Sequence, residues 1–272
     1  MKKLSIITIC YNEPNLEKTC ESIVNQTWQD FEWIVVDGGS NEETQKIWDK
    51  YKHRIDKFVS EPDNGIYNAC NKGIKLSNGQ YLIFMNAGDC FYHKDILNLF
   101  NCFSGNNYSD IYYGQCECTY KKANNQGDYI SNYPSKLSKE FFILSNICTQ
   151  GMFINKNIFE KYGLFNEQYR VCADYEKWLQ LPIQTFLYFP VIVANYDLNG
   201  ISSIKKTRDL TFTEKNSIRN RYYTEKEILK AESIYKMQYS FWENIFSLKN
   251  THNKTHKVVT IFGIHIKIKR SK

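Results

Sequence analysis

The fold class is indicated by the stretch "LSIITICYNEPNLEKTCESIVNQTWQDFEWIVVD", residues 4–37. Its two ends, 4–10 and 31–37, are rich in β-branched and aromatic residues and have the length of buried strands. Between them, residues 15–27 carry apolar side chains three and four positions apart, which is the spacing of an amphipathic helix. A strand, a helix and a strand in this order predict a βαβ unit with two parallel strands.

The same alternation continues along the chain. Further strands are expected at residues 55–61 and 80–86, and further helices at 41–52 and 65–76. The pattern predicts an α/β domain, a Rossmann-like sheet with helices on both faces. Residues 101–140 are rich in Asn, Tyr, Ser and Lys, and we expect surface loops and edge strands there.

The chain is expected to have three parts: an α/β domain at residues 1–205, helices at 206–250 and a basic tail at 251–272. The helical pattern of the second part runs to about residue 249. In the tail, "FGIHIKIKR" alternates apolar with mostly cationic residues. Period two predicts an extended ribbon, with a hairpin to the preceding "KVVTIF" as one arrangement.

Charge is unevenly distributed over the 272 residues, whose net charge is +6. The tail holds six Lys or Arg and no acid, and the rest of the chain holds 29 basic and 29 acidic residues. A neutral body argues against a nucleic-acid partner, because such proteins show a basic face. The tail has two interpretations: a strand packed on the body, or a contact with an anionic membrane surface.

The cysteine pattern indicates a reducing compartment. The nine cysteines are odd in number and no pair has CxxC spacing, so free thiols are expected. No apolar run approaches the ~18 residues of a membrane span, and the N-terminal run reads as a strand rather than a signal peptide. We therefore expect a cytoplasmic protein, with peripheral contact at the inner face of the cell membrane as an option.

Polar residues follow each predicted strand of the sheet. The sequence places Glu13, Asp37, Asp63 and Asp89 at these points, and ligands of parallel sheets bind at the carboxyl ends of the strands. Turn and helix-capping roles are the alternative for each. The chain has no GxGxxG, GxxxxGK[ST] or GxSxG motif. Carboxylates would repel a nucleotide diphosphate unless Mn²⁺ or Mg²⁺ bridges them, and Asp89 is suited to hold such a cation.

Three long segments and one short one resemble a known family. They are "LSIITICYNEPNLEKTCESIVNQTWQDFEWIVVDGGSNEET", "SEPDNGIYNACNKGIKLSNGQYLIFMNAGD", "GMFINKNIFEKYGLFNEQYRVCADYEKWLQL" and, at 199–203, "NGISS". In order and spacing they are similar to glycosyltransferase family 2, in particular to bacterial members that build surface polysaccharides. The resemblance implies a GT-A fold and transfer from a nucleotide-diphosphate sugar to a glycan or lipid-linked glycan.

The resemblance also implies roles for particular residues. Asp37 would accept a hydrogen bond from the base, typically uracil, Asp89 would coordinate the metal, and Asp174 would be the catalytic base of an inverting reaction. A carboxylate can take the proton that the acceptor hydroxyl loses, although a helix N-cap is the alternative role for Asp174. The implied nucleotide-binding residues are Thr8, Tyr11, Asn12, Glu13, Asp37, Asp63 and Asn86.

The sequence departs from the family pattern at several points. Asn86 and Gly88 stand where most members have the aspartates of a DxD-type motif, so Asp89 alone keeps its charge, and Gly38 replaces a further aspartate. The QxxRW motif of processive synthases is absent, which favours transfer of a single sugar. Two alternatives stay open: a related protein that binds nucleotide or sugar with little catalysis, and a sugar-nucleotidyltransferase.

Overall fold

The computed structural model describes the chain in five stretches, with side chains up to residue 236. The stretches are residues 2–119, 128–198, 207–250, 256–261 and 264–269. The segment "NGISS" therefore lies outside the described residues. The chain divides into two compact units, Met1–Arg219 and Asn220–Lys272.

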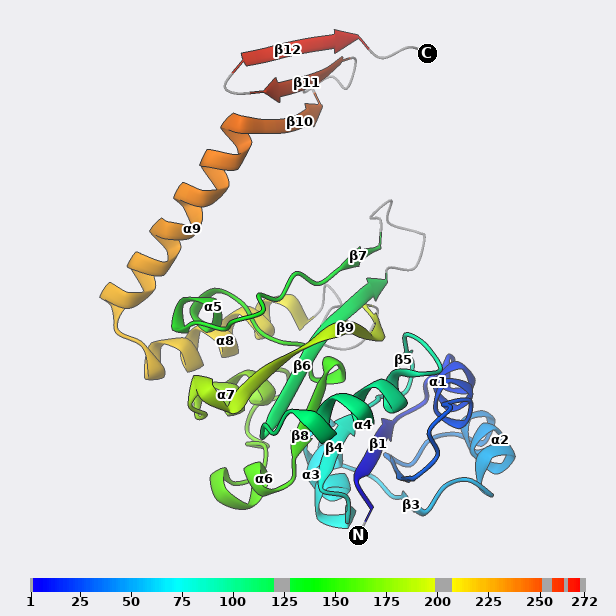
Figure 1. Cartoon of the computed structure of the whole chain (residues 1–272). Helices are drawn as coiled ribbons and strands as arrows, with labels where there is room; N and C mark the ends of the chain where they lie inside the picture. The colour runs from blue at the N-terminus through cyan, green and yellow to red at the C-terminus, as the bar shows by residue number, and fades with distance from the viewer. Residues whose placement is uncertain (1, 120–127, 199–206, 251–255, 262–263, 270–272) are drawn as a thin grey trace. The chain divides into compact units, whose positions relative to one another are not determined.

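The first unit is built on a mixed sheet that has nine strands within the described residues (Figure 1). The strand order is β3-β2-β1-β4-β8-β6-β9-β5, with β7 paired to β6. The first four strands are parallel, as predicted, whereas β8 runs antiparallel to both β4 and β6. The strands are β1 Leu4–Cys10, β2 Phe31–Asp37, β3 Lys57–Ser60, β4 Tyr81–Phe84, β5 Cys90–Phe91, β6 Ile111–Thr119, β7 Tyr129–Ile130, β8 Met152–Asn155 and β9 Phe186–Asp197.

Helices cover both faces of this sheet, as the sequence predicts. Helices α1, α2 and α4 pack in one hydrophobic cluster, and α3, α5, α6 and α7 pack in another. The helices are α1 Leu16–Val24, α2 Glu42–Tyr51, α3 Ile66–Leu76, α4 Ile96–Asn106, α5 Lys139–Leu144, α6 Asn157–Tyr162, α7 Ala173–Leu179 and α8 Arg208–Tyr222.

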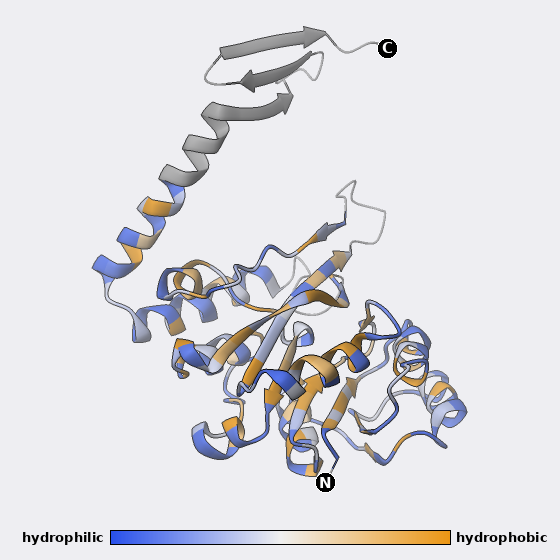
Figure 2. Ribbon diagram, in the orientation of Figure 1, coloured by the Kyte–Doolittle hydropathy of each residue, from blue (hydrophilic) through white to orange (hydrophobic). Residues whose placement is uncertain are grey.

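Strand β1 contributes side chains to the hydrophobic clusters on both faces of the sheet. Leu4 and Ile6 belong to the first cluster, whereas Ile7 and Ile9 belong to the second. Side chains of a strand alternate between the faces of the sheet, so a strand covered on both sides is apolar throughout. Figure 2 shows hydrophobic colours along the central strands.

The expectation for residues 101–140 is wrong in two places. Helix α4 extends to Asn106, and β6 is a central strand between β8 and β9 rather than an edge strand. Tyr112 and Tyr113 of β6 are buried, and their hydroxyls donate to the carbonyls of Asn107 and Pro134. A tyrosine can be buried when its hydroxyl finds an acceptor, so a tyrosine-rich composition does not indicate a surface strand.

The second unit contains a long helix and a small sheet. Helix α9 spans Glu225–Ile245, and β10 Phe246–Asn250, β11 His256–Ile261 and β12 Ile264–Lys269 form an antiparallel sheet in that order. The expected hairpin is confirmed, with Val259 opposite Ile266. The helical pattern expected to about residue 249 ends at Ile245, where pairing with β11 satisfies the backbone instead. None of the helices within the described stretches is long and apolar enough to cross a membrane.

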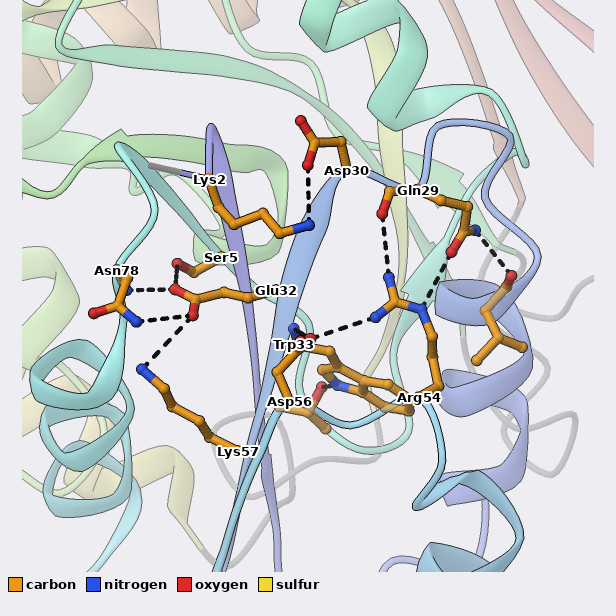
Figure 3. Close-up of polar contacts among 12 residues, drawn as sticks. Lys2, Ser5, Gln29, Asp30, Glu32, Trp33, Arg54, Asp56, Lys57 and Asn78 are labelled. Carbon is orange, nitrogen blue, oxygen red and sulfur yellow. Dashed lines mark hydrogen bonds and ion pairs between the residues drawn. The ribbon is translucent and has the colours of Figure 1, made fainter.

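A buried carboxylate connects the amino-terminal ends of neighbouring strands of the main sheet by hydrogen bonds (Figure 3). Glu32 of β2 is 4% exposed, and its Oε1 accepts hydrogen bonds from Ser5 Oγ at 2.5 Å, Gly79 N at 3.0 Å and Asn78 N. Lys57 Nζ lies 3.7 Å from Glu32 Oε2. Burial raises the pKa of Glu32, but these hydrogen bonds and the Lys57 charge outweigh it and hold the pKa below its ordinary value.

Glu32 should therefore stabilise the fold in a pH-dependent way. A lowered pKa means that the stabilisation is present above the ordinary pKa of about 4.3 and is lost as the pH falls through the folded-state pKa. Glu32→Gln should reduce the free energy of unfolding at pH 7 by about 1.5–3 kcal/mol, because charge-assisted hydrogen bonds are lost. Urea unfolding at pH 7 and near pH 4 should show the difference shrinking in acid.

The matched control is Asp30→Asn, which breaks the exposed pair between Asp30 and Lys2, 2.9 Å apart. An exposed pair contributes little, so this variant should change the free energy of unfolding by less than about 1 kcal/mol. An equal loss for Glu32→Gln at both pH values would contradict the role of the ionised carboxylate.

Candidate active site

A cavity of about 820 Å³ opens at the carboxyl ends of the central strands. Strand β1 pairs with β2 on one side and β4 on the other, so the chain leaves β1 at a switch point in the strand order. The predicted site residues that line the cavity are Tyr11, Glu13, Asp63, Asn86, Asp89 and Asp174. Thr8, Asn12 and Asp37 are not among its lining residues.

Asp89 follows β4 and is buried with both carboxylate oxygens hydrogen-bonded. Gln150 Nε2 donates to Oδ2 at 2.8 Å, and Asp197 N donates to Oδ1 at 2.9 Å. The pKa of Asp89 is raised to about 7: burial is the main cause, the charges of Asp197 and Glu13 add to the rise, and the two hydrogen bonds oppose it. A cation at this position would stabilise the ionised carboxylate.

The oxygens around Asp89 fit a divalent cation, although they are few. Asn86 lines the same cavity, and its buried Oδ1 has no hydrogen-bond partner among the described residues. Glu13 lies close by, since a Cβ on Gly88 would be 3.3 Å from Glu13 Cδ. No cluster of three or more His, Cys, Asp or Glu suited to a metal occurs among the described residues. Mn²⁺ or Mg²⁺ would therefore depend on oxygens from a diphosphate and water as well.

Gly88 also explains part of the departure from the DxD pattern. Its φ of +99° lies in a region that L-residues rarely adopt, so an aspartate here would be strained. At Gly38, a Cβ would lie 2.6 Å from Asp63 Oδ2. The carboxylate of Asp63, which accepts a hydrogen bond from Gly65 N at 2.8 Å, thus occupies the space that an aspartate at position 38 would need.

Asp174 is the second residue of α7 and is half-buried in the cavity wall. Cys172, not Asp174, is the N-cap residue of this helix. Burial raises the pKa of Asp174, and hydrogen bonds oppose that rise. The donors are Tyr67 Oη at 3.0 Å and Tyr175 N at 2.8 Å to Oδ1, with Asn146 Nδ2 at 3.2 Å and Thr149 Oγ1 at 3.3 Å to Oδ2.

Asp37 ends β2 with one oxygen satisfied and one free. Its Oδ2 accepts hydrogen bonds from Ser60 Oγ at 2.6 Å, Gln45 Nε2 at 2.8 Å and Ser40 N at 2.9 Å. Its Oδ1 is buried and has no partner among the residues that the structure describes. Burial raises the pKa of Asp37, but the hydrogen bonds outweigh it and lower the pKa below its ordinary value. The side chain is a fully buried, ionised acceptor, and one of its oxygens has no hydrogen-bond partner among the described residues.

Thr8 and Asn12 have structural partners instead of a place in the cavity wall. Thr8 is fully buried, and its Oγ1 accepts a hydrogen bond from Trp33 Nε1 at 3.0 Å. Asn12 has a φ of 51°, a conformation that asparagine tolerates, and its Oδ1 accepts from Asn41 N at 2.8 Å. Tyr11, which directly precedes Asn12, is 67% exposed and lines the cavity.

Sequence reasoning missed the residues that hold the two cavity carboxylates. Gln150 binds Asp89, and Thr149, next to it in the chain, binds Asp174. Arg170 also lines the cavity. These residues carry no motif spacing of their own; Arg170 lies within a segment that resembles the family, and Thr149 and Gln150 lie immediately before that segment.

The fold is that of glycosyltransferases of known structure. S. aureus TarS 1-349, solved in complex with UDP, has a TM-score of 0.62 at 16% identity, and the match covers 81% of this chain and 65% of that chain. The mannosyltransferase PcManGT from Pyrobaculum calidifontis, solved with GDP-Man and Mn²⁺, has a TM-score of 0.52 at 16% identity, covering 70% and 55%. The predicted GT-A fold is confirmed.

Sequence comparison agrees with the fold. The model of glycosyl transferase family 2 matches residues 5–163. The PGL/p-HBAD biosynthesis glycosyltransferase of Mycobacterium bovis is 31% identical over 208 residues, which cover 73% of this chain and 78% of that relative. The chain belongs to glycosyl transferase family 2 and is a glycosyltransferase. This membership argues against the nucleotidyltransferase alternative.

Proposed function

We propose that the chain transfers one sugar from a UDP-linked donor to a hydroxyl of a glycan or lipid-linked glycan, with inversion at the anomeric carbon. The observation that carries the proposal is the pairing of Asp89 and Asp174 in the wall of one cavity, brought from positions far apart in the sequence. Asp89 would act on the diphosphate of the donor through a bound cation, and Asp174 would act on the acceptor hydroxyl. Release of a nucleoside diphosphate from a panel of nucleotide sugars with Mn²⁺ tests it; release of pyrophosphate would contradict it.

The donor side rests on Asp37 and Tyr11. The free Oδ1 of Asp37 can accept a hydrogen bond from an imide N–H such as that of uracil, and its lowered pKa keeps it ionised. Tyr11 is an exposed ring beside Gly38 that can contact the nucleotide. UDP accompanies the related fold in one solved TarS structure and UDP-GlcNAc in another, which supports the choice of uracil.

Asp89 and Asn86 would hold the divalent cation. When bound, Mn²⁺ or Mg²⁺ supplies positive charge that offsets the diphosphate and the charge that develops on it as the bond to the sugar breaks. Gln150 and the backbone N–H of Asp197 orient the Asp89 carboxylate from the protein side. The remaining lone pairs of its oxygens are then available on the cavity side.

Asp174 would take the proton from the acceptor hydroxyl as that oxygen attacks the anomeric carbon. Four donors fix its carboxylate, and burial raises its pKa, which makes it a better base than an exposed aspartate. Attack from the face opposite the leaving diphosphate inverts the configuration of the sugar.

Asp174→Asn should reduce the transfer rate by roughly 10²–10⁴-fold, because the amide cannot accept the proton. In the wild-type enzyme the base works only when ionised. Activity should therefore fall as the pH drops through a pKa above the ordinary ~3.9 of aspartate. Steady-state rates between pH 4 and 8 measure both effects, and UDP affinity by calorimetry should be nearly unchanged. A variant with half of the wild-type turnover would remove Asp174 from the mechanism.

Asp37→Ala and Asp89→Ala should lower activity for different reasons, the first through nucleotide affinity and the second through the response to metal. The first should weaken UDP binding by about tenfold or more, since a hydrogen bond to a charged group contributes about 1.5–3 kcal/mol. The second should abolish the increase in activity on adding Mn²⁺ or Mg²⁺. Titration of UDP and of metal against each variant separates the two roles. Full wild-type activity in EDTA would contradict the metal-dependent mechanism.

The acceptor and the location of the reaction are proposed from the tail. We propose a bacterial surface polysaccharide as the product and the cytoplasmic face of the membrane as the place of transfer. Residues 251–272 hold six Lys or Arg and no acid. In the hairpin register, Lys267 pairs with Val258 and Lys269 with His256. Each cation near an anionic leaflet contributes about 1 kcal/mol, which suffices for reversible attachment.

The full-length chain should sediment with anionic phospholipid vesicles at low salt and be released at high salt. The double variant Lys267→Glu, Lys269→Glu should stay in the supernatant, because it reverses two charges of the tail. Lys18→Glu, Lys46→Glu makes the same change on exposed positions of the first unit and serves as the control. Equal sedimentation of both double variants would leave the tail without a membrane role.

A further inference from the structure

Helix α8 reaches the active site through one buried carboxylate. Glu214 is 9% exposed, and its Oε1 accepts a hydrogen bond from Arg170 N at 2.9 Å. Its Oε2 accepts from Val171 N at 3.0 Å and Cys172 N at 3.1 Å. Three consecutive backbone N–H groups thus converge on a single side chain from another element. Buried N–H groups need acceptors, and an ionised carboxylate is the strongest that a protein offers.

The segment held by Glu214 leads directly into the catalytic helix. Cys172 is the N-cap residue of α7 and makes no side-chain capping bond, and Asp174 follows two positions later. Arg170 and Val171 line the cavity themselves. The position of these three residues therefore determines where α7 begins and where Asp174 meets its donors.

Further contacts join α8 to the same region. The thiol of Cys172 donates to the carbonyl of Thr211 with an S···O distance of 3.6 Å, and Lys215 Nζ donates to the carbonyl of Leu144 at 3.2 Å. Lys215 Nζ also lies 5.3 Å from the ring centre of Tyr175, which follows Asp174. Among these contacts, Glu214 is the one that binds the backbone leading into α7.

We infer that Glu214 is a positioning residue for Asp174: by holding residues 170–172 it places the carboxylate of Asp174 against its hydrogen-bond donors at the cavity. Both α7 and α8 lie beyond residue 163, where the match to the family model ends. The inference rests on the proposed role of Asp174 as the base.

Glu214→Gln offers one acceptor oxygen and turns an NH₂ group toward backbone N–H donors. We expect kcat to fall by about 10- to 100-fold while the dissociation constant of UDP changes by less than about threefold, since Asp37 is on other elements. Water should gain access to Asp174, so the acid limb of the pH profile should shift to lower pH. The ionisable groups near Asp174 are Tyr67 and Cys70 on α3, Cys172 before α7 and Lys215 on α8, and the variant retains them all.

Glu214→Asp keeps a carboxylate and should recover part of kcat.

Asp209→Asn is the matched control, because it neutralises an exposed acid in the first turn of the same helix. It should leave kcat and the pH profile unchanged. Unaltered UDP binding shows that each variant is folded. An unshifted acid limb for Glu214→Gln, or a loss equal to that of the control, would overturn the inference.

Amide hydrogen exchange supplies a readout that does not require activity. The amides of residues 170–172 should exchange faster in Glu214→Gln than in the wild-type chain. If exchange speeds up and the transfer rate does not fall, Glu214 is a structural cap and the positioning role is wrong. If the wild-type chain transfers no sugar while exchange responds as expected, the proposed function fails and the contact itself stands.

Discussion

The parallel pairing of β1 with both β2 and β4 is the constraint on which the site depends. It brings the carboxyl ends of three strands to one edge of the sheet, where the chain must turn and where backbone N–H groups and polar side chains meet. Because successive side chains of β1 point to opposite faces of the sheet and both faces are covered, the strand is buried along its whole length and only its end is open to a ligand. The cavity, with Asp89 and Asp174 in its wall, is a consequence of that arrangement.

Three aspartates at this edge differ because their surroundings differ. Asp37 has a lowered pKa from three hydrogen bonds to one oxygen, and its other oxygen is free. Asp89 and Asp174 have raised pKa values because burial outweighs their hydrogen bonds. These surroundings match the three roles proposed above, a permanently ionised acceptor for Asp37, a metal ligand for Asp89 and a base for Asp174, and perturbed pKa values of this kind gather at functional sites.

The site is held both from within residues 5–163, which the family model matches, and from beyond them. Gln150 and Thr149 fix the two cavity carboxylates from a single short turn between β8 and α5. Glu214 binds the backbone just before α7 from a helix still further along the chain. Buried carboxylates require many satisfied partners, and the fold recruits them from wherever the chain passes nearby.

The sequence by itself determined the alternation of strands and helices over the first 86 residues, the hairpin of the tail and the identity of Asp37, Asp89 and Asp174 as candidates, because these follow from local periodicity and from resemblance. Tertiary structure decided that β6 is central, that Thr8 faces Trp33, and that Asp63 fills the space beside Gly38. It also decided which donors reach Asp174. Tyr67 and Asp174 are 107 positions apart, and no local pattern records which distant side chain will satisfy a buried oxygen.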